Sequence, residues 1–400
     1  MTGARRRIGV GVIGFGWMGQ AHSRSLLRLP TLFPDRRYQP ELVACSDTAP
    51  ERRARATSAF GFRDGLADWR TLVEHPDVDA VWVTAPNKLH LDVIEAACAA
   101  RKHVFCEKPV GRAPEATVRA AQLARTAGVT TGVGYNYRWA PLVQYAKRLI
   151  DEGAVGEIVH YEGRFFSMYG ADPAARLTWR FLMDEGGFGA TADVLSHALD
   201  LAHFLVGPLA RVVATSATFI PERPLARPGD GTHYDRGDPD DPTGPVTNED
   251  YVGALAVFAS GAQASFAACR TFIGPESQNA FEIHGTKGAL AWNLETMNEL
   301  RVYLAGEQLH TGYTTVYGGD RFPYHGAFAP GSANGIGFED LIAIEDHEFC
   351  SALGEDRPFA PGFEEALALV GVQDACIRSW SSQRWEDVQP LERPAKEVAA

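Results

Sequence analysis

IGVGVIGFGWMG, residues 8–19, is an apolar run of strand type followed at once by the pattern GxGxxG. In such a turn the first glycine, Gly14, makes the tight bend, and the second, Gly16, lets the backbone approach a pyrophosphate. The third, Gly19, lets the next helix pack closely on the strand, with its N-terminus toward the phosphates. Because a strand precedes the pattern and a helical stretch follows it, the sequence predicts a dinucleotide site here. The predicted contacts are Gly14, Phe15, Gly16, Trp17, Met18 and Gly19.

The first third of the chain continues this alternation of strands and helices. After the strand at 8–13, strands are predicted at 41–46, 80–84, 103–106 and 129–134, and helices at 20–29, 50–60, 89–100 and 114–127. Strands separated by helices of about ten to fifteen residues indicate right-handed βαβ units and a parallel sheet with helices on both faces. We therefore predict an α/β Rossmann domain that binds NAD(P), over residues 1–135.

The pattern changes after Tyr135. Residues 221–249 hold six prolines, five aspartates and four glycines with almost nothing apolar, so they are expected to form a surface loop. Both a plain insertion and the border of a binding site fit such a loop. The alternating runs around it favour an open, mostly antiparallel sheet, and with the helices they predict an α+β domain over 136–400. The runs are 157–166, 211–220, 251–260, 262–272, 280–284, 289–292 and 299–304, and the helices are 141–152, 190–206, 339–353 and 363–381.

Composition narrows the classes of function. The 400 residues are 45% hydrophobic and 22% charged, which excludes a disordered chain or a fibre. With 38 basic and 50 acidic residues, the net charge of −12 offers no general attraction to nucleic acid or anionic lipid. No apolar run is long enough to span a membrane, and the start carries no secretion-type cleavage site. Six cysteines without a CxxC pair complete the expectation of a soluble cytoplasmic protein with reduced core thiols and no metal site.

Asp47 is the residue from which the cofactor preference is predicted. It ends the second strand, where a carboxylate can accept hydrogen bonds from the hydroxyls of the adenosine ribose. A carboxylate there also repels a 2′-phosphate, which favours NAD. Arg52 and Arg53 are expected to be solvated at a helix start, but they stand close enough in sequence to leave NADP open.

Three ionisable residues further along stand where a catalytic site could form. Lys108, in the tripeptide EKP, follows the fourth strand at the edge where such sheets bind ligands, and it could polarise an alcohol or carbonyl oxygen. Asp193 and His197 lie four residues apart and share one face of the predicted helix at 190–206. Taken alone, a surface turn and the polar outer face of an amphipathic helix, continued by Asp200 and Phe204, explain these patterns better than a catalytic site does.

A group of aromatic and polar side chains points to the kind of ligand. Tyr135 stands where the first domain is predicted to end, and Tyr169, Trp179 and Arg180 follow in the second. Aromatic faces combined with guanidinium donors suit a polyhydroxylated ring, whose C–H face stacks while its hydroxyls form hydrogen bonds. Each aromatic residue taken singly is more often part of a core.

Five stretches occur in the order found in one family, and over most of its length the chain resembles the Gfo/Idh/MocA oxidoreductases. The combination of EKP with a later DxxxH is specific, and it favours the catalytic interpretation of both. Within the family, ADPAARLTWRF, PERP and NGIGFEDL are most similar to dehydrogenases that act on anhydrosugars and at a sugar 3-hydroxyl. Two departures are Ala192, where a glycine is common, and the acidic loop 221–249. The five stretches are GVIGFGWMGQAH, TAPNKLHLDVIEAACAARKHVFCEKPVGR, GYNYRWAP, GGFGATADVLSHALDLAHFLVG and FEIHGTKGAL.

The resemblance implies a Rossmann domain and an open-faced sheet domain used for oligomerisation, with a homodimer or homotetramer expected. It implies hydride transfer between nicotinamide and a ring secondary alcohol, or its ketone, of a sugar, anhydrosugar or cyclitol. Catalytic positions fall on Lys108, Asp193 and His197, with Pro109 on the family's proline, which is often cis. The implied substrate contacts are Lys108, Tyr135, Tyr169, Trp179, Arg180, Asp193 and His197. Further implied cofactor contacts are Ala85, Pro86, Asn87, His90, Glu107, Lys108 and Asn136.

In the expected mechanism His197 is the general base toward the hydroxyl, and Lys108 polarises the same oxygen or relays the proton. Asp193 orients the substrate or the catalytic pair, and which of Lys108 and His197 takes the proton stays open. Two other functions stay open as well: an NAD-dependent glycosidase that works by transient oxidation and elimination, and a non-catalytic dinucleotide-sensing regulator. A regulator would have no need of both Lys108 and His197.

Overall fold

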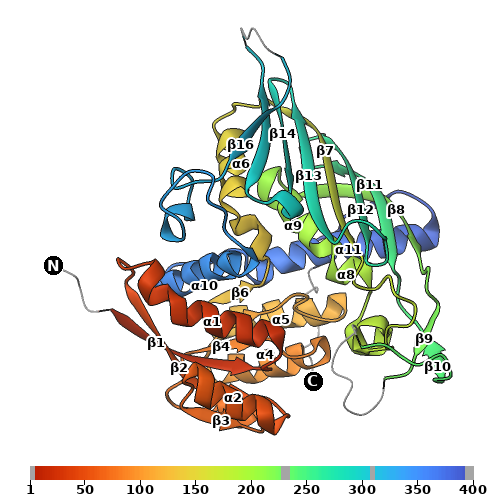
Figure 1. Cartoon of the computed structure of the whole chain (residues 1–400). Helices are drawn as coiled ribbons and strands as arrows, with labels where there is room; N and C mark the ends of the chain where they lie inside the picture. Colours follow the sequence, from red (N-terminus) through yellow and green to blue (C-terminus); the bar gives the residue numbers. More distant parts are fainter. Residues whose placement is uncertain (1–4, 227–234, 307–310, 392–400) are drawn as a thin grey trace, which may run out of the picture.

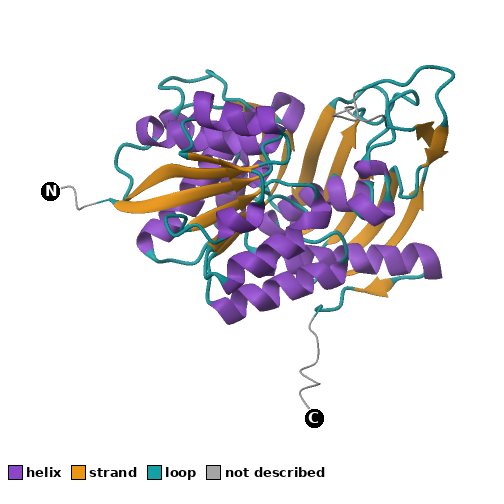
Figure 2. Cartoon of the chain, turned by 90° about the horizontal axis from the view of Figure 1, so that it is seen from below, coloured by secondary structure: helices purple, strands orange, loops and turns teal. Residues whose placement is uncertain are grey.

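The computed structural model describes residues 5–226, 235–306 and 311–391. Its N-terminal part contains β1 (Arg6–Ile13), α1 (Trp17–Leu32), β2 (Tyr38–Ser46), α2 (Pro50–Phe60), β3 (Asp64–Leu66), α3 (Trp69–Val73), β4 (Ala80–Val83), α4 (His90–Ala99), β5 (His103–Cys106), α5 (Pro114–Ala127) and β6 (Thr131–Val133). The six strands form one sheet in the order β3-β2-β1-β4-β5-β6, with every pair parallel. This is the strand order of dinucleotide-binding folds, and helices cover both faces (Figure 2). The predicted Rossmann-type fold is confirmed.

Two helices of this part begin and end at the predicted residues because their end signals are strong. Both α2 and α5 have proline in the first turn, where the missing N–H is not needed. Each is followed by a glycine in the left-handed region, Gly61 with φ 80° and Gly128 with φ 67°. By contrast β3 and α3, with three and five residues, were not predicted because they are too short to show a period.

The C-terminal part holds a nine-stranded sheet in the order β16-β15-β14-β13-β7-β12-β11-β8-β17. Among the described pairs only β7 and β12 are parallel, so the predicted open, mostly antiparallel sheet is confirmed. The strands are β7 (Ile158–Ser167), β8 (Leu209–Ala217), β11 (Tyr251–Phe258), β12 (Gln263–Cys269), β13 (Ser277–Gly285), β14 (Gly288–Asn293), β15 (Glu299–Leu304), β16 (Thr314–Tyr317) and β17 (Glu386–Asp387). The helices are η2 (Asn136–Trp139), α6 (Pro141–Asp151), η3 (Trp179–Phe181), α7 (Met183–Gly186), α8 (Ala190–Asp193), α9 (Leu195–Leu205), η4 (Leu294–Thr296), η5 (His325–Ala327), α10 (Phe338–Glu355) and α11 (Phe363–Ser382).

The predicted helix at 190–206 is broken into α8 and α9 at Val194. The backbone oxygen of Asp193 accepts hydrogen bonds from Lys108 Nζ at 3.1 Å and Ser196 Oγ at 2.9 Å, so side chains occupy an acceptor that a continuous helix would use. The expected polar outer face is also wrong. Asp200 is only 2% exposed and pairs with the buried Arg138, because η2, which carries Arg138, packs on α9 together with α6 and α11.

Helix α10 lies beside α1 of the parallel sheet, although more than 300 residues separate the two in sequence (Figure 1). Arg24 Nε donates to Glu339 Oε2 at 2.9 Å, and Arg28 Nη2 donates to Asp340 Oδ1 at 2.6 Å. These pairs connect the first turn of α10 to α1, the helix that follows the glycine-rich turn.

The segment 221–249 is only in part the surface loop that was predicted. Its two ends form the small antiparallel pair β9 (Glu222–Pro224) and β10 (Thr243–Pro245), and residues 227–234 lie outside the described ranges. Arg223 is fully buried, and Asn248, Glu249 and Asp250 are buried as well. Composition did not reveal this, because the residues that enter the core here are polar and bury through hydrogen bonds.

All six cysteines lie within the described ranges and are buried free thiols, as expected of core residues. No helix in the described part of the chain has both the length and the hydrophobicity to cross a bilayer.

Candidate active site

The glycine-rich turn between β1 and α1 has the shape that a dinucleotide requires. Gly14 has φ 91°, and a Cβ added there would lie 2.7 Å from the backbone nitrogen of Ala85. A Cβ at Gly19 would lie 2.1 Å from the oxygen of Gly14, whereas a Cβ at Gly16 would meet nothing within 4 Å. The turn is thus closed on the protein side and open at Gly16, which leaves room for phosphates above the helix N-terminus.

The side chains of this turn have different surroundings. Phe15 is fully buried and packs edge-on against Phe60 and Phe62, so only its backbone can reach a ligand. Trp17 is 64% exposed and stacks on Phe338 of α10 at 5.5 Å.

Asp47, at the end of β2, is held in place by the same turn. Its Oδ2 accepts a hydrogen bond from the backbone N–H of Phe15 at 2.7 Å, and its Oδ1 accepts one from Ala49 at 2.9 Å. Arg53 donates to the backbone oxygen of Asp47 at 2.8 Å, and Arg52 lies 3.5 Å from its carboxylate. The two arginines are therefore not simply solvated, and each touches the residue that is expected to meet the ribose.

Replacing Asp47 with Ser should weaken NAD binding by about 10- to 100-fold, the loss expected for charge-assisted hydrogen bonds. Binding of NADP should change less, because the repulsion of its 2′-phosphate disappears together with those bonds. Titration of both dinucleotides against the two proteins measures the change in preference. Tighter binding of NADP than NAD by the unmodified protein would contradict the assignment.

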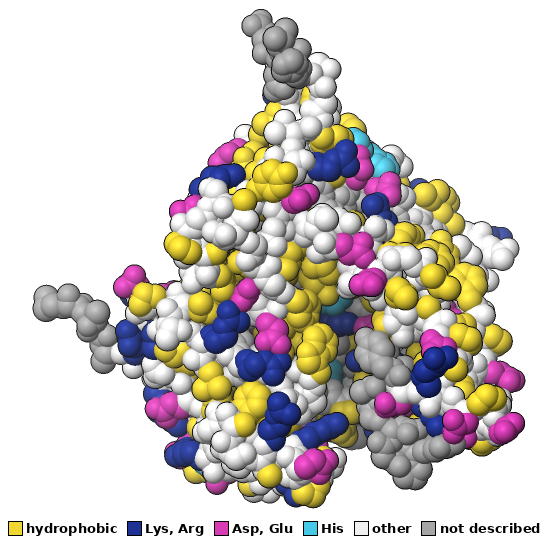
Figure 3. Space-filling model, in the orientation of Figure 1, with side chains coloured by type: hydrophobic (Ala, Val, Ile, Leu, Met, Phe, Trp, Pro, Cys, Tyr) yellow, Lys and Arg dark blue, Asp and Glu magenta, His cyan; other side chains and the backbone are white. Residues whose placement is uncertain are grey.

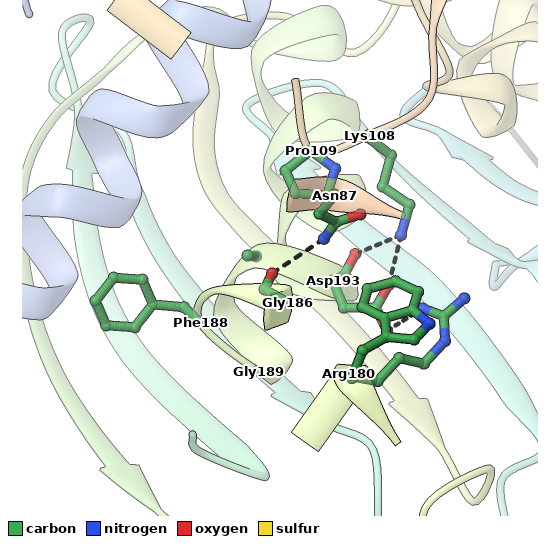
Figure 4. Close-up of a pocket in the computed structure, with 10 residues that line it drawn as sticks. Asn87, Lys108, Pro109, Arg180, Gly186, Phe188, Gly189 and Asp193 are labelled. Carbon is green, nitrogen blue, oxygen red and sulfur yellow. Dashed lines mark hydrogen bonds and ion pairs between the residues drawn. The ribbon is translucent and has the colours of Figure 1, made fainter. Parts of the chain in front are cut away.

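Lys108 and Asp193 meet across the cleft between the two parts of the molecule, and they point toward one another in Figure 4. Lys108 Nζ lies 2.5 Å from Asp193 Oδ1, and the hydroxyl of Tyr169 donates to Asp193 Oδ2 at 2.6 Å. Burial would raise the pKa of Asp193, but the charges of Lys108 and Arg180 hold that pKa far below its usual range. Asp193 is therefore an anion that fixes the ammonium group of Lys108. The peptide bond between Lys108 and Pro109, in the loop after β5, is cis, as the family resemblance implied.

His197 is buried next to this pair. Its ring lies edge-on to Tyr137 at 4.7 Å and to Tyr135 at 5.9 Å, and its Nδ1 has no hydrogen-bond partner among the residues that the structure describes. Burial first, and then the charge of Lys108, lower the pKa of His197 well below 6.5, although Asp193 opposes them. The imidazole is therefore neutral near pH 7 and can accept a proton.

Four of the predicted substrate contacts line one pocket at this cleft. Trp179 and Arg180 line it together with Lys108 and Asp193, and the Arg180 guanidinium lies 4.6 Å from the centre of the Trp179 ring. Figure 3 shows the hollow between the two parts of the molecule, in which basic and histidine side chains gather. Tyr135 and Tyr169 stand behind this surface, against His197 and Asp193 respectively.

The remaining predicted cofactor contacts follow the carboxyl ends of β4, β5 and β6, with His90 as the first residue of α4 and Asn136 as the first of η2. The ring nitrogens of His90 lie 2.8 Å from the backbone oxygens of Ala85 and Pro109, so His90 joins two loops instead of facing a ligand. Asn87, next to Pro86, donates to the oxygen of Gly186 across the cleft at 3.0 Å. Asn136 is buried, and within the described part of the chain its Nδ2 has no hydrogen-bond partner.

Sequence reasoning missed a buried charge network beneath Lys108. His22 of α1 lies between two carboxylates, with Nδ1 2.9 Å from Asp346 of α10 and Nε2 3.2 Å from Glu107. Trp82 also donates to Asp346 at 2.9 Å, and Glu107 accepts from the backbone N–H of Lys108 at 3.2 Å. The one local signal was the histidine three residues after GxGxxG, inside the stretch GVIGFGWMGQAH.

Within the described residues, no group of three or more His, Cys, Asp or Glu side chains could hold a metal ion. The polar groups of the cleft are a lysine, an arginine, a carboxylate and a neutral imidazole, which suits proton transfer next to a dinucleotide.

Comparison with known proteins agrees with this geometry. Residues 8–135 match the oxidoreductase family with an NAD-binding Rossmann fold, and residues 143–291 match the Gfo/Idh/MocA C-terminal domain. Levoglucosan dehydrogenase of Pseudarthrobacter phenanthrenivorans is 36% identical over 96% of this chain and 99% of that protein. Inositol 2-dehydrogenase of Rhizobium meliloti is 26% identical over 94% of this chain and 97% of that protein. A solved structure of levoglucosan dehydrogenase with NADH and levoglucosan has a TM-score of 0.90 and 35% identity, covering 96% of this chain and 100% of that one.

Fold and cleft together define an oxidoreductase with an NAD-binding Rossmann domain. The chain belongs to the Gfo/Idh/MocA family, as the matches to both of its domains and the similarity along almost the whole length show.

Proposed function

We propose that the protein is an NAD-dependent dehydrogenase acting on a ring secondary alcohol of a sugar, anhydrosugar or cyclitol, or on the corresponding ketone. The observation that carries the proposal is the meeting of Lys108, Asp193 and a neutral His197 at the sheet edge where the glycine-rich turn also ends. The names of the similar proteins, levoglucosan dehydrogenase and inositol 2-dehydrogenase, support this substrate class.

The residues around the turn fit NAD. The Gly14 to Gly19 turn would hold the pyrophosphate and Asp47 the adenosine ribose, while Ala85, Asn87 and Asn136 would line the nicotinamide end. When bound, the nicotinamide supplies the acceptor or donor of the hydride. We assign His90 and Glu107 a positioning role, because their side chains connect loops and the buried network.

The proton chemistry follows from the charges of the cleft. With substrate and dinucleotide bound, the neutral imidazole of His197 would accept the proton of the substrate hydroxyl. The Lys108 ammonium would lie against the same oxygen and stabilise the negative charge that develops there. Asp193, bonded to Lys108 and Tyr169, keeps the ammonium in position. Trp179 and Arg180 give the ring a face to stack on and donors for its other hydroxyls.

The proposal is tested by incubating the purified protein and NAD with levoglucosan, myo-inositol, D-xylose and other sugars while NADH absorbance is followed. We expect NADH with at least one carbohydrate that has a free ring hydroxyl. If none of them yields NADH, and none of their ketones consumes it, the proposal is wrong.

Replacing Trp179 with Ala should raise KM for the sugar by about tenfold, in line with the ~1.5 kcal/mol that an aromatic contact contributes. Affinity for NAD should stay nearly unchanged, because Trp179 lies on the second part of the molecule. Steady-state kinetics and a dinucleotide titration measure the two effects. An equal loss of both would mean that Trp179 supports the fold and not the substrate.

We also propose that the protein works in the cytoplasm as a homodimer or homotetramer, with no nucleic-acid or membrane partner. Support comes from the sheet face opposite α9, where Leu255 is 56% exposed and Tyr251 packs against Phe219, itself 53% exposed. Light scattering on the purified protein measures the number of subunits, and a monomer would contradict the proposal.

A further inference from the structure

The turn that carries Trp179 and Arg180 is held from below by an aromatic ring. Phe181, the last residue of η3, is fully buried and contributes no surface to the cleft. The Arg223 guanidinium carbon lies 4.1 Å from the centre of this ring, and that of Arg270 lies 4.7 Å from it. Both arginines are almost completely buried. Two desolvated cations on one ring form a strong and directional contact.

The two arginines are themselves fixed by hydrogen bonds. Arg223 donates through Nη1 to the backbone oxygen of Asp172 at 2.7 Å and through Nη2 to that of Gly170. Arg270 bonds to Asp250 Oδ1 at 2.8 Å and to Asn248 Oδ1 at 2.8 Å. Arg223 thus donates through both Nη atoms, while its buried Nε has no partner among the described residues, and Arg270 donates through Nε and both Nη atoms. A lysine could not reproduce this planar set of donors.

The backbone of the turn is bonded to the same region. The oxygen of Arg180 accepts bonds from Arg270 Nη1 and from Asn248 Nδ2, each at 3.0 Å. The oxygen of Phe181 accepts one from the N–H of Thr247 at 3.0 Å. Arg223 lies near one end of the acidic segment 221–249, and Thr247 and Asn248 lie near its other end.

We propose that the two ends of the segment 221–249, residues 221–226 and 243–249, fix the turn at 179–181 and thereby determine which sugars the cleft accepts, with Arg223 as a positioning residue. This inference rests on the proposed function, because it takes Trp179 and Arg180 as substrate contacts. The turn is therefore supported by charged groups and hydrogen bonds, and small displacements of such a support reach the substrate directly.

The test compares Arg223→Lys with Arg236→Lys. Arg236 is a control in the same segment, and its side chain is 71% exposed. Arg223→Lys should raise KM for levoglucosan, or for the best substrate of the panel, by about tenfold. The kcat and the affinity for NAD should change by less than about threefold, and the ratio of kcat/KM between two sugars should shift. Arg236→Lys should behave as the unmodified protein.

A second variant, Asn248→Asp, keeps the inference testable if Arg223→Lys does not fold. Asn248→Asp has nearly the same shape but loses the amide donors to the oxygens of Arg180 and Gly187, so it should move KM in the same direction. Folded Arg223→Lys and Asn248→Asp variants with unchanged KM and unchanged sugar ratio would overturn the inference while leaving the dehydrogenase in place. If Arg223→Lys does not fold, Asn248→Asp alone decides. An unmodified protein that makes no NADH from any sugar would instead overturn the proposed function, and the inference with it.

Discussion

Lys108→Ala and His197→Ala should each lower kcat by about 10² to 10⁴, the contribution of a positioned acid or base. Both variants should still bind NAD, because neither side chain belongs to the glycine-rich turn. Lys108 lies on the loop after β5 and His197 on α9, so they act on one oxygen only if the cleft is the active site. Since they serve one proton transfer, the double variant should lose much less than the product of the single losses.

The matched control is Lys147→Ala, a lysine of α6 that pairs with Asp151 and does not line the pocket, and it should keep normal turnover. Single variants with near-normal kcat on a confirmed substrate would contradict the assignment. Losses that simply multiply in the double variant would keep both residues in the site but deny that they act together.

His22→Gln should destabilise the protein by about 3–5 kcal/mol near neutral pH, because it removes the cation from between two buried carboxylates. Burial alone would lower the pKa of His22, but Asp346 and Glu107 outweigh it and raise that pKa from 6.5 to about 10. A pKa raised by folding contributes stability that is complete below pH 6.5 and is lost as the pH rises to about 10. The unmodified protein should therefore lose stability over this window, and the variant should lack that part of the slope.

Denaturant midpoints measured across this pH window test the effect. His284→Gln is the control, since His284 is 45% exposed and its pair with Glu282 lies on the open sheet face. Parallel pH curves for His22→Gln and the unmodified protein would show that His22 is not a buried cation.

The parallel sheet could be predicted because its signals are local. The turn at Gly14, the proline starts of α2 and α5 and their closing glycines all lie within a few residues of the boundaries they set. The meeting of Lys108 with Asp193 could not be derived from spacing, since 85 residues separate them and each alone resembles an exposed polar residue. Only the resemblance to a family placed both in one site.

What could not be predicted is burial that depends on distant partners. Asp200 was placed on a polar outer face because helical period separates polar from apolar residues but does not show whether a second layer covers the polar side. Arg138, its partner, is 62 residues away. The network of His22 with Asp346 spans 324 residues, and Arg223 lies in a stretch whose composition predicted only a loop. In each case the partner of a buried charged group is distant in sequence, and only the folded structure brings the two together.

If the protein is a dehydrogenase, the reaction transfers a hydride in net from a sugar carbon to NAD. The most direct measurement is the stoichiometry of the reaction with levoglucosan, or with the best substrate of the panel, by counting NADH, ketone and free sugar in one incubation. We expect one NADH for each ketone formed, with Lys108→Ala slowing both products equally. Release of a free sugar without net formation of NADH would contradict the account and would point to a glycosidase that oxidises its substrate only transiently.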